Sequence, residues 1–282
     1  MNCGITGHRG ALGQEFIKYN KKINFIKFQG DLTKKKQIEK WVQKNSFDVF
    51  VHFAAIVPTK FVEKFYLKSK KVNVLGTKYL IDALSKFQKK KLKWFFFASS
   101  SHVYKFQNKK IKETDKILPV TKYGKTKFEA EKMLLKRTEN ICIGRIFSFT
   151  HKTHSEDYLI PSLYNKIFLS KKKKIIFENL NHYRDFLDTS DICSAITRLM
   201  IKKKIGIYNV CSGKKINLKD LAMFMAKKKK ILYEFKKKEY KITKLIGNND
   251  KLLSTGWKPK KNIEFIIKSY IREKNKNVSS NK

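Results

Sequence analysis

Arginine is scarce in this otherwise very basic chain. Lysine and arginine together number 65 against 23 acidic residues, which gives a formal net charge of +42, yet 59 of the 65 are lysines. The six arginines stand at positions 9, 137, 145, 184, 198 and 272. Proteins that read bases or clamp phosphates rely on the planar guanidinium fork. We therefore interpret the charge as lysine spread over solvated surfaces, which attracts anionic substrates, and expect no specific nucleic-acid partner.

Cysteine and long apolar runs are equally sparse. The four cysteines, at positions 3, 142, 193 and 211, include no Cys-x-x-Cys pair, which is typical of free thiols in a reducing compartment, so a cytoplasmic location is expected. No apolar run approaches the roughly 20 residues of a membrane helix, and the N-terminus has no signal-peptide pattern. His151, His154 and His182 have no spacing typical of a metal site. Membrane and metal partners are therefore not expected.

The informative glycines lie at the start of the chain. Met1 to Ile5 predicts a short buried strand, glycines follow at positions 7, 10 and 13, and a helix resumes through Phe16 and Ile17. A helix N-terminus next to glycines offers free N–H groups and lets a pyrophosphate approach the backbone. The spacing is Gly-x-x-Gly-x-x-Gly, not the commoner Gly-x-Gly-x-x-Gly. Its position directly after an N-terminal strand predicts a dinucleotide site.

Strands and helices alternate through the first part of the chain. Apolar strands are expected at 23–28, 48–53, 94–98 and 141–146, and helices at 33–44, 72–87 and 123–136. This order predicts an α/β fold, a doubly wound parallel Rossmann-type sheet formed mainly by residues 1–150. Residues 151–272 predict a smaller α+β substrate-binding portion, from which the chain can cross back to the sheet. Residues 273–282 are expected to form a frayed tail.

Tyr123 and Lys127 are the residues of most chemical interest. They lie four apart on a predicted helix and therefore on one face. A nearby ammonium favours the phenolate, which would lower the tyrosine pKa and make it a usable acid or base. Ser100 follows a predicted parallel strand at its carboxyl end, where such sheets bind ligands. The Tyr-x-x-x-Lys pair gains its meaning from the glycine loop and these serines.

Together these motifs resemble the extended short-chain dehydrogenase/reductases, the NAD(P)-dependent epimerase/dehydratase group that acts on nucleotide sugars. The resemblance covers nearly the whole chain. Its segments are Thr6 to Gly13, Gly30-Asp31-Leu32, His52 to Ala55, Asn73 with Gly76-Thr77, Ser99 to Tyr104, Tyr123 with Lys127, Arg184 to Leu187 with Ser190-Asp191-Ile192, Tyr208 to Gly213, and Asp250-Lys251-Leu252 with Gly256 to Pro259.

The resemblance implies hydride transfer at a carbon of a nucleotide-linked sugar, by a 4-epimerase or a 4-keto reductase. It assigns the catalytic roles to Ser100, with Ser101 as the alternative, and to Tyr123 and Lys127. Ser100, His102 and Arg184 would contact the substrate, the arginine at its diphosphate. The implied cofactor-binding residues are Gly7, Arg9, Gly10, Ala11, Leu12, Gly13, Asp31, Leu32, Ala54, Ala55, Tyr123 and Lys127. A homodimer through the helices at 72–87 and 123–136 is also implied.

The sequence departs from the family at several places. Only one strand fits before Asp48, so the sheet should be one strand narrower on that side. Asp31 could be a ribose-binding acid by distance, but its Gly-Asp-Leu context favours the adenine side. With no clear ribose acid, Arg9 could meet a 2′-phosphate, which favours NADP over NAD. No Asp-Glu pair follows Ser100, which argues against a 4,6-dehydratase.

Two questions stay open at this stage. His102 could transfer a proton or could simply pack beside the substrate. A non-catalytic NAD(P)-binding regulatory or scaffold protein on the same fold is the alternative function. Such a protein would have no need for Ser100, Tyr123 and Lys127 together, which argues against it.

Overall fold

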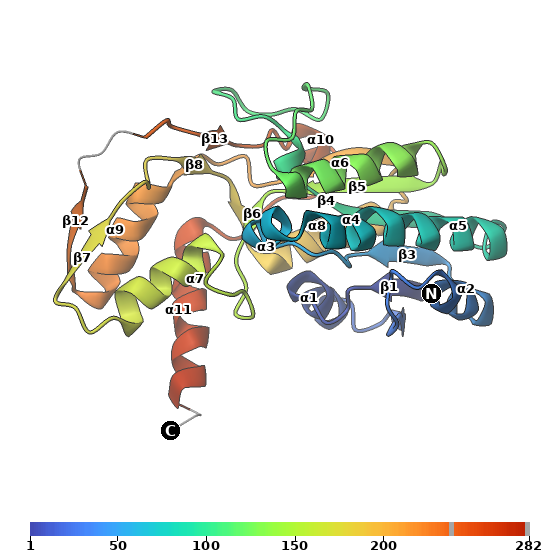
Figure 1. Cartoon of the computed structure of the whole chain (residues 1–282), viewed down its shortest axis with the longest axis horizontal. Coiled ribbons are helices and arrows are strands. Elements are labelled where there is room, and N and C mark those ends of the chain that lie inside the picture. Colours follow the sequence, from blue (N-terminus) through green and yellow to red (C-terminus); the bar gives the residue numbers. More distant parts are fainter. Residues whose placement is uncertain (237–239, 280–282) are drawn as a thin grey trace.

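A six-stranded parallel sheet forms the centre of the molecule (Figure 1). The computed structural model describes residues 1–236 and 240–279. In spatial order the strands are β10 (Gly206–Val210), β5 (Ile141–Ile146), β4 (Trp94–Ser100), β3 (Val49–His52), β1 (Asn2–Thr6) and β2 (Asn24–Lys27). The predicted doubly wound parallel fold is confirmed. Because β2 is the edge strand, the narrower sheet expected on that side is confirmed as well.

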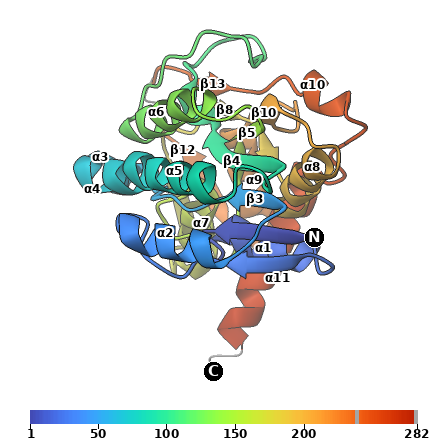
Figure 2. The ribbon, with the colours of Figure 1, turned by 90° about the vertical axis from the view of Figure 1, so that its right-hand side faces the viewer.

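Helices cover both faces of this sheet (Figure 2). Helices α1 (Ala11–Tyr19) and α8 (Thr189–Ile201) pack on one face, and α2 (Lys35–Lys44), α5 (Thr77–Phe87) and α6 (Lys122–Leu135) on the other. The run Trp94 to Ala98 serves both cores because successive side chains of a strand point to opposite faces. Trp94 and Phe96 belong to the α1/α8 core, while Phe95 and Phe97 belong to the other. A strand buried on both faces therefore needs its continuous apolar sequence.

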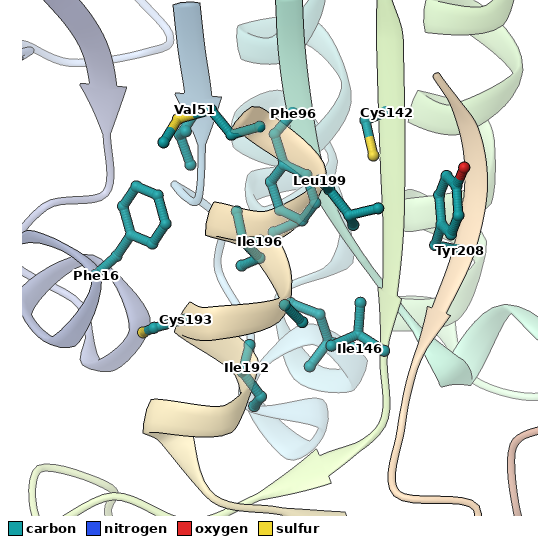
Figure 3. Close-up of a cluster of buried hydrophobic side chains, with 14 of the residues drawn as sticks. Phe16, Val51, Phe96, Cys142, Ile146, Ile192, Cys193, Ile196, Leu199 and Tyr208 are labelled. Carbon is teal, nitrogen blue, oxygen red and sulfur yellow. The ribbon is translucent and has the colours of Figure 1, made fainter. Parts of the chain in front are cut away.

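Helix α8 and strand β10 come from beyond residue 150 and return to the sheet. Figure 3 shows Ile192, Ile196 and Leu199 of α8 facing Phe96 and Ile146 of the sheet. All five side chains are buried. The core around the large sheet, formed mainly by residues 1–150, is thus completed by segments from beyond residue 150. The domain boundary expected at residue 150 stays a prediction.

The rest of the second half forms a separate layer beside the sheet, at the left of Figure 1. Its own core contains Ile167, Phe177, Leu221 and Ile267. Its strands form three small sheets: β7 (Lys174–Phe177) with β12 (Leu232–Phe235), β8 (Tyr183–Arg184) with β11 (Ile216–Asn217) and β13 (Lys244–Leu245), and β6 (Ser148–Phe149) with β9 (Phe186–Leu187). Its helices are α7 (Leu159–Tyr164), which continues as the π-helix η3 (Asn165–Leu169), α9 (Leu218–Lys229) and α11 (Ile263–Ser279). The short helix α10 (Asp250–Leu253) lies instead against β10 of the large sheet.

The helix expected at 72–87 is present, but its first part is a π-helix. Two short helices, α3 (Thr59–Lys64) and α4 (Tyr66–Lys70), lead into a π-helix, η1 (Lys71–Gly76), and only then into α5. Within η1 the Asn73 amide accepts a hydrogen bond from Ile56 N (2.7 Å) and donates one to Ile56 O (2.9 Å). This side chain ties the helix to the segment after β3. π-Bulges of this kind are frequent at functional sites.

The frayed tail expected at 273–282 is wrong for most of its length. Helix α11 continues through Ser279, and residues 280–282 lie outside the described residues. Tyr164 Oη hydrogen-bonds Asn275 Oδ1 at 2.7 Å, which fixes the helix to α7, and no glycine or proline interrupts it. Although α11 has 17 residues, no helix in the described ranges is long and apolar enough to span a bilayer.

Candidate active site

The glycine loop between β1 and α1 makes a cradle with no room for side chains. Gly7 has a φ of 72°, and Gly10 N donates to Gly7 O at 3.0 Å, which closes the turn. A Cβ on Gly7 would lie 2.5 Å from Ala54 N, and one on Gly13 would overlap Gly7 O. Helix α1 begins at Ala11, so its first-turn N–H groups face this cradle. The residues present therefore fit a bound pyrophosphate.

A groove with a volume of about 720 Å³ extends from this cradle along the sheet edge. It is lined by all ten residues that were expected to bind the cofactor outside the Tyr-Lys pair: Gly7, Arg9, Gly10, Ala11, Leu12, Gly13, Asp31, Leu32, Ala54 and Ala55. Pockets for small-molecule cofactors typically measure about 300–1,000 Å³. The structure thus brings these residues together in a groove of suitable size.

Positive groups gather where β2 ends beside the groove. Burial and the charges of Arg9 and Lys27 lower the pKa of His8, so these three side chains are close neighbours. Arg9 is exposed and has no acidic partner among the described residues. Asp31 instead accepts hydrogen bonds from Thr33 N and Thr33 Oγ1, both at 2.8 Å, which lowers its pKa. This corner of the groove is therefore suited to an anion.

A second cavity, of about 430 Å³, adjoins the groove. The two share Leu12, Phe53, Val57, Phe149 and Tyr158 in their linings. Every residue expected to act in catalysis or to touch the substrate lines the second cavity: Ser100, His102, Tyr123, Lys127 and Arg184. Groups that are far apart in the sequence therefore meet where a ligand in the groove would end.

Ser100 and Tyr123 line the same cavity. Ser100 is the last residue of β4, and its Oγ accepts a hydrogen bond from His102 N at 3.2 Å. Burial raises the pKa of Tyr123 above its ordinary range, and the hydrogen bond with Ser100 partly opposes that rise. Ser101 starts the 3-10 turn η2 (Ser101–Val103) instead. Of the two serines considered, Ser100 is the one that acts on the pKa of Tyr123.

Lys127 was expected to lower the pKa of Tyr123, and this expectation is wrong for the protein without a bound cofactor. Lys127 Nζ donates a hydrogen bond to Ala98 O at 2.7 Å and lies 4.8 Å from the centre of the Phe97 ring. Burial lowers the pKa of Lys127 to about 7. Desolvation is the largest influence on the pKa of Tyr123 and Lys127 is not among the groups that lower it, so Tyr123 retains its proton at neutral pH.

His102 and Arg184 line the same cavity. The His102 ring meets Tyr123 edge-on at 5.7 Å, and burial together with Arg184 lowers the pKa of His102 to about 4. Arg184 donates to Tyr183 O (2.8 Å), Thr243 O (3.1 Å) and Thr243 Oγ1 (3.0 Å), and burial lowers its pKa to about 10. It has no carboxylate partner within the described part of the chain. A half-buried guanidinium without a counter-charge is a candidate anion site.

Tyr158 was not found by sequence reasoning. It lines both cavities, stacks on His154 with ring centres 4.1 Å apart, and lies close enough to Tyr123 to raise the pKa of that phenol. It directly precedes α7, at whose N-cap it lies. Across residues 1–236 and 240–279, no three His, Cys, Asp or Glu side chains are grouped as metal ligands would be.

Comparisons with known proteins agree over nearly the whole chain. A family profile described as GDP-mannose 4,6 dehydratase matches residues 8–270. A GDP-6-deoxy-D-talose 4-dehydrogenase from Aggregatibacter actinomycetemcomitans is 27% identical over 272 residues, which is 90% of each chain. A GDP-6-deoxy-D-mannose reductase from Pseudomonas aeruginosa is 26% identical over 245 residues, covering 80% of this chain and 78% of the other.

The same fold occurs in solved structures. The structure of RMD from Pseudomonas aeruginosa complexed with NADPH superposes with a TM-score of 0.85 at 21% identity. The match covers 96% of this chain and 97% of that one.

Proposed function

Because the chain belongs to the GDP-mannose 4,6 dehydratase family of NAD(P)-dependent short-chain dehydrogenase/reductase enzymes, we propose that it is a 4-keto reductase of a nucleotide-linked sugar. The observation that carries the proposal is that Ser100, Tyr123 and Lys127 line one cavity, which is continuous with the glycine groove. A regulatory protein that only binds the cofactor would not need this arrangement.

The residues of the cavity have different roles in the reduction of a ketone. When bound, the nicotinamide supplies the hydride. Tyr123 retains its proton because burial raises its pKa, and it donates this proton to the carbonyl oxygen of the sugar. The Ser100 hydroxyl donates a hydrogen bond to the same oxygen, where negative charge develops. Lys127, next to both, contributes positive charge when it is protonated.

The substrate would be held by Arg184 and His102 in the same cavity. Arg184 meets a diphosphate oxygen with a guanidinium that lacks a counter-charge. His102 is neutral at neutral pH because burial and Arg184 lower its pKa to about 4, so it can donate or accept a hydrogen bond with the sugar. Both contacts suit an anionic nucleotide sugar.

Two observations favour a reductase over the family's other reactions. No Asp-Glu pair follows Ser100, since Ser101 and His102 stand there, which argues against a 4,6-dehydratase. The two relatives described above, a 4-dehydrogenase and a reductase of GDP-linked deoxy sugars, align with most of this chain. A GDP-linked 4-keto-6-deoxy sugar is therefore the first substrate to test.

The experiment is a screen of purified protein. GDP-, dTDP- and UDP-linked 4-keto-6-deoxy sugars are incubated with NADPH, and both cofactor absorbance and product identity are followed. A reductase consumes one cofactor per product, whereas a 4-epimerase, tested on the UDP- and GDP-hexoses, converts sugar without net consumption. Cofactor binding with no turnover of any sugar would support the non-catalytic alternative instead.

The variant Tyr123→Phe tests the role of the phenol. Loss of a general acid typically lowers turnover by about 10²–10⁴-fold, while cofactor affinity should stay within about 3-fold because the ring keeps its packing. Steady-state rates and fluorescence titration with NADPH measure the two quantities. Unchanged turnover in this variant would contradict the assignment.

A further inference from the structure

A fully buried ion pair lies behind the Tyr-Lys pair. Arg145 of β5 binds Glu131 of α6 through Nη2 to Oε2 at 2.7 Å and through Nε to both carboxylate oxygens at 3.1 and 3.2 Å. Each side chain is 1% exposed. Such a pair costs about as much in desolvation as it returns in attraction. Stability alone is therefore a poor reason for this pair, and its surroundings suggest another role.

Glu131 also contacts the strand that presents the serine. The Ser99 hydroxyl donates to Glu131 Oε1, and Ser99 directly precedes Ser100 at the end of β4. Arg145 in turn donates to Tyr104 Oη at 2.7 Å, which extends the network into the loop after β4. The carboxylate thus fastens the end of β4 to α6, the helix that carries Tyr123.

Lys127 has one acidic neighbour. Tyr123, Lys127 and Glu131 are spaced four residues apart on α6, so they share one buried face. From β3, His52 also faces Lys127, but burial lowers the pKa of His52 to about 3, so it is neutral. From β4 the Lys127 ammonium meets the Phe97 ring and the Ala98 carbonyl. In the part of the chain that the structure describes, Glu131 is thus the acid that acts on this ammonium.

We propose that Glu131 is a positioning residue for the reaction: held by Arg145, its carboxylate fixes the end of β4 next to Ser100 and is the buried counter-charge of Lys127. The inference rests on the proposed function, since it assumes that Ser100, Tyr123 and Lys127 act on the substrate. It concerns a residue that touches neither substrate nor cofactor.

The counter-charge decides the protonation of Lys127. Burial already lowers the pKa of Lys127 to about 7, with Glu131 acting in the opposite direction. Loss of a nearby opposite charge typically lowers the pKa of a base by about one unit or more. Without Glu131, Lys127 would be mostly neutral at pH 7 and could no longer support a developing negative charge.

The variant Glu131→Gln therefore has an expected pH signature. The alkaline limb of kcat/KM should move to lower pH by about one unit, because activity requires protonated Lys127. Glu131→Asp, which keeps the charge, should return the limb toward its wild-type position. The matched control is Glu129→Gln, on the same helix as Glu131. It removes a partly exposed carboxylate that pairs with Lys70 of α4 at 2.9 Å. The pH profile of this control should not change. An equal loss of activity at every pH would show a structural role and overturn the proposal.

A second measurement needs no substrate or cofactor. The folded pKa of Lys127, about 7, lies below its ordinary 10.5, so the unfolded chain binds more protons between these values. Lys127 should therefore add stability as the pH rises across this window. Its contribution is measured as the difference between the wild type and Lys127→Met, because the four buried cysteines, whose pKa is raised above 9.0, act in the opposite direction at the upper end of the window. With Glu131→Gln, the lower edge of the window should move below pH 7. An unchanged window would overturn the proposal.

The variant Glu131→Gln could fold poorly, so a second variant is needed. Because Glu131→Gln leaves the Arg145 guanidinium buried without its partner, both measurements are repeated with Glu131→Gln/Arg145→Met, which removes both charges of the pair. The two proposals can fail separately. If the wild type reduces no nucleotide sugar, the proposed function fails, yet the unfolding experiment still tests Glu131; if Tyr123→Phe is inactive while Glu131→Gln shifts neither quantity, only this inference fails.

Discussion

The Arg9 guanidinium provides the sharpest test of cofactor choice at the scale of one residue. It is exposed at the mouth of the groove, close to His8 and Lys27, and has no acidic partner in the described ranges. We expect Arg9→Ala to weaken NADPH binding by about 10–100-fold, as loss of a charge-assisted bidentate contact would. Binding of NADH, which has no 2′-phosphate, should change by less than about 2-fold.

Titration of both cofactors into the wild type and the variant measures this difference. Arg9→Lys is the informative companion, because it keeps the charge but not the planar fork and should recover part of the affinity. Lys18→Ala removes an exposed lysine of α1, the helix that follows the Arg9 loop, and is the control for loss of positive charge alone. Equal affinity of the wild type for NADPH and NADH would refute the preference.

At this scale the sequence predicted which residues meet, but not their electrostatics. Tyr123, Lys127 and Ser100 could be found from spacing and position, because helical periodicity and strand ends are local properties. The direction of the Tyr123 pKa could not, since it depends on burial by distant segments. Glu131 was missed for a similar reason: its importance comes from Ser99 and Arg145, which are 32 and 14 residues away in the chain.

Among the elements, α6 depends on a single capping residue. Thr121 precedes the helix, and its Oγ1 accepts a hydrogen bond from Gly124 N at 3.0 Å. A Cβ on Gly124 would overlap His102 O, so this first turn packs directly on the turn η2. Tyr123 lies inside the same turn. The cap therefore positions the phenol as well as starting the helix.

We expect Thr121→Ala to lower the free energy of unfolding by about 1 kcal/mol, the usual loss for an N-cap. Turnover should fall as well, because fraying of the first turn moves Tyr123. Thr121→Ser keeps the hydroxyl and should behave like the wild type in both respects. Denaturant unfolding and steady-state rates measure the two effects; a destabilised variant with unchanged turnover would show that Tyr123 is held by other contacts.

Element boundaries followed from sequence where the signals were local. The helix expected at 123–136 is observed at 122–135. Thr33 was expected to cap the next helix, but Lys34 takes that position because the Thr33 hydroxyl donates to Asp31 Oδ1 instead. The π-helix at 71–76 depends on Asn73 and Ile56, a contact across 17 residues that no local pattern contains.

On the scale of the whole molecule, strand and helix alternation predicted the parallel sheet and its missing edge strand. The interdependence of the two halves was harder to predict. Strand β10 pairs with β5, and α8 supplies Ile192, Ile196 and Leu199 to the core beneath β4. Apolar periodicity indicates that these segments are buried, but it does not indicate which half of the chain they pack against.

This interdependence predicts the behaviour of a fragment that contains residues 1–150. Without α8, the side chains of Phe96 and Ile146, which are at most 6% exposed in the whole chain, would face water on one side of the sheet. Without β10, strand β5 would become an unpaired edge. We expect the fragment to lack a cooperative unfolding transition and to bind NADPH weakly, even though it contains the whole glycine loop. Circular dichroism during denaturant unfolding and cofactor titration measure both properties.

The matched experiment in the whole chain is Ile196→Ala. Ile196 is 0% exposed and lies on α8 against the sheet, so its truncation should cost about 2–5 kcal/mol of stability. Affinity for NADPH should stay near that of the wild type while the protein remains folded, since no groove residue is changed. A fragment 1–150 that unfolds cooperatively and binds NADPH as the whole chain does would show that the cofactor half folds without α8 and β10, and would restore residue 150 as a true domain boundary.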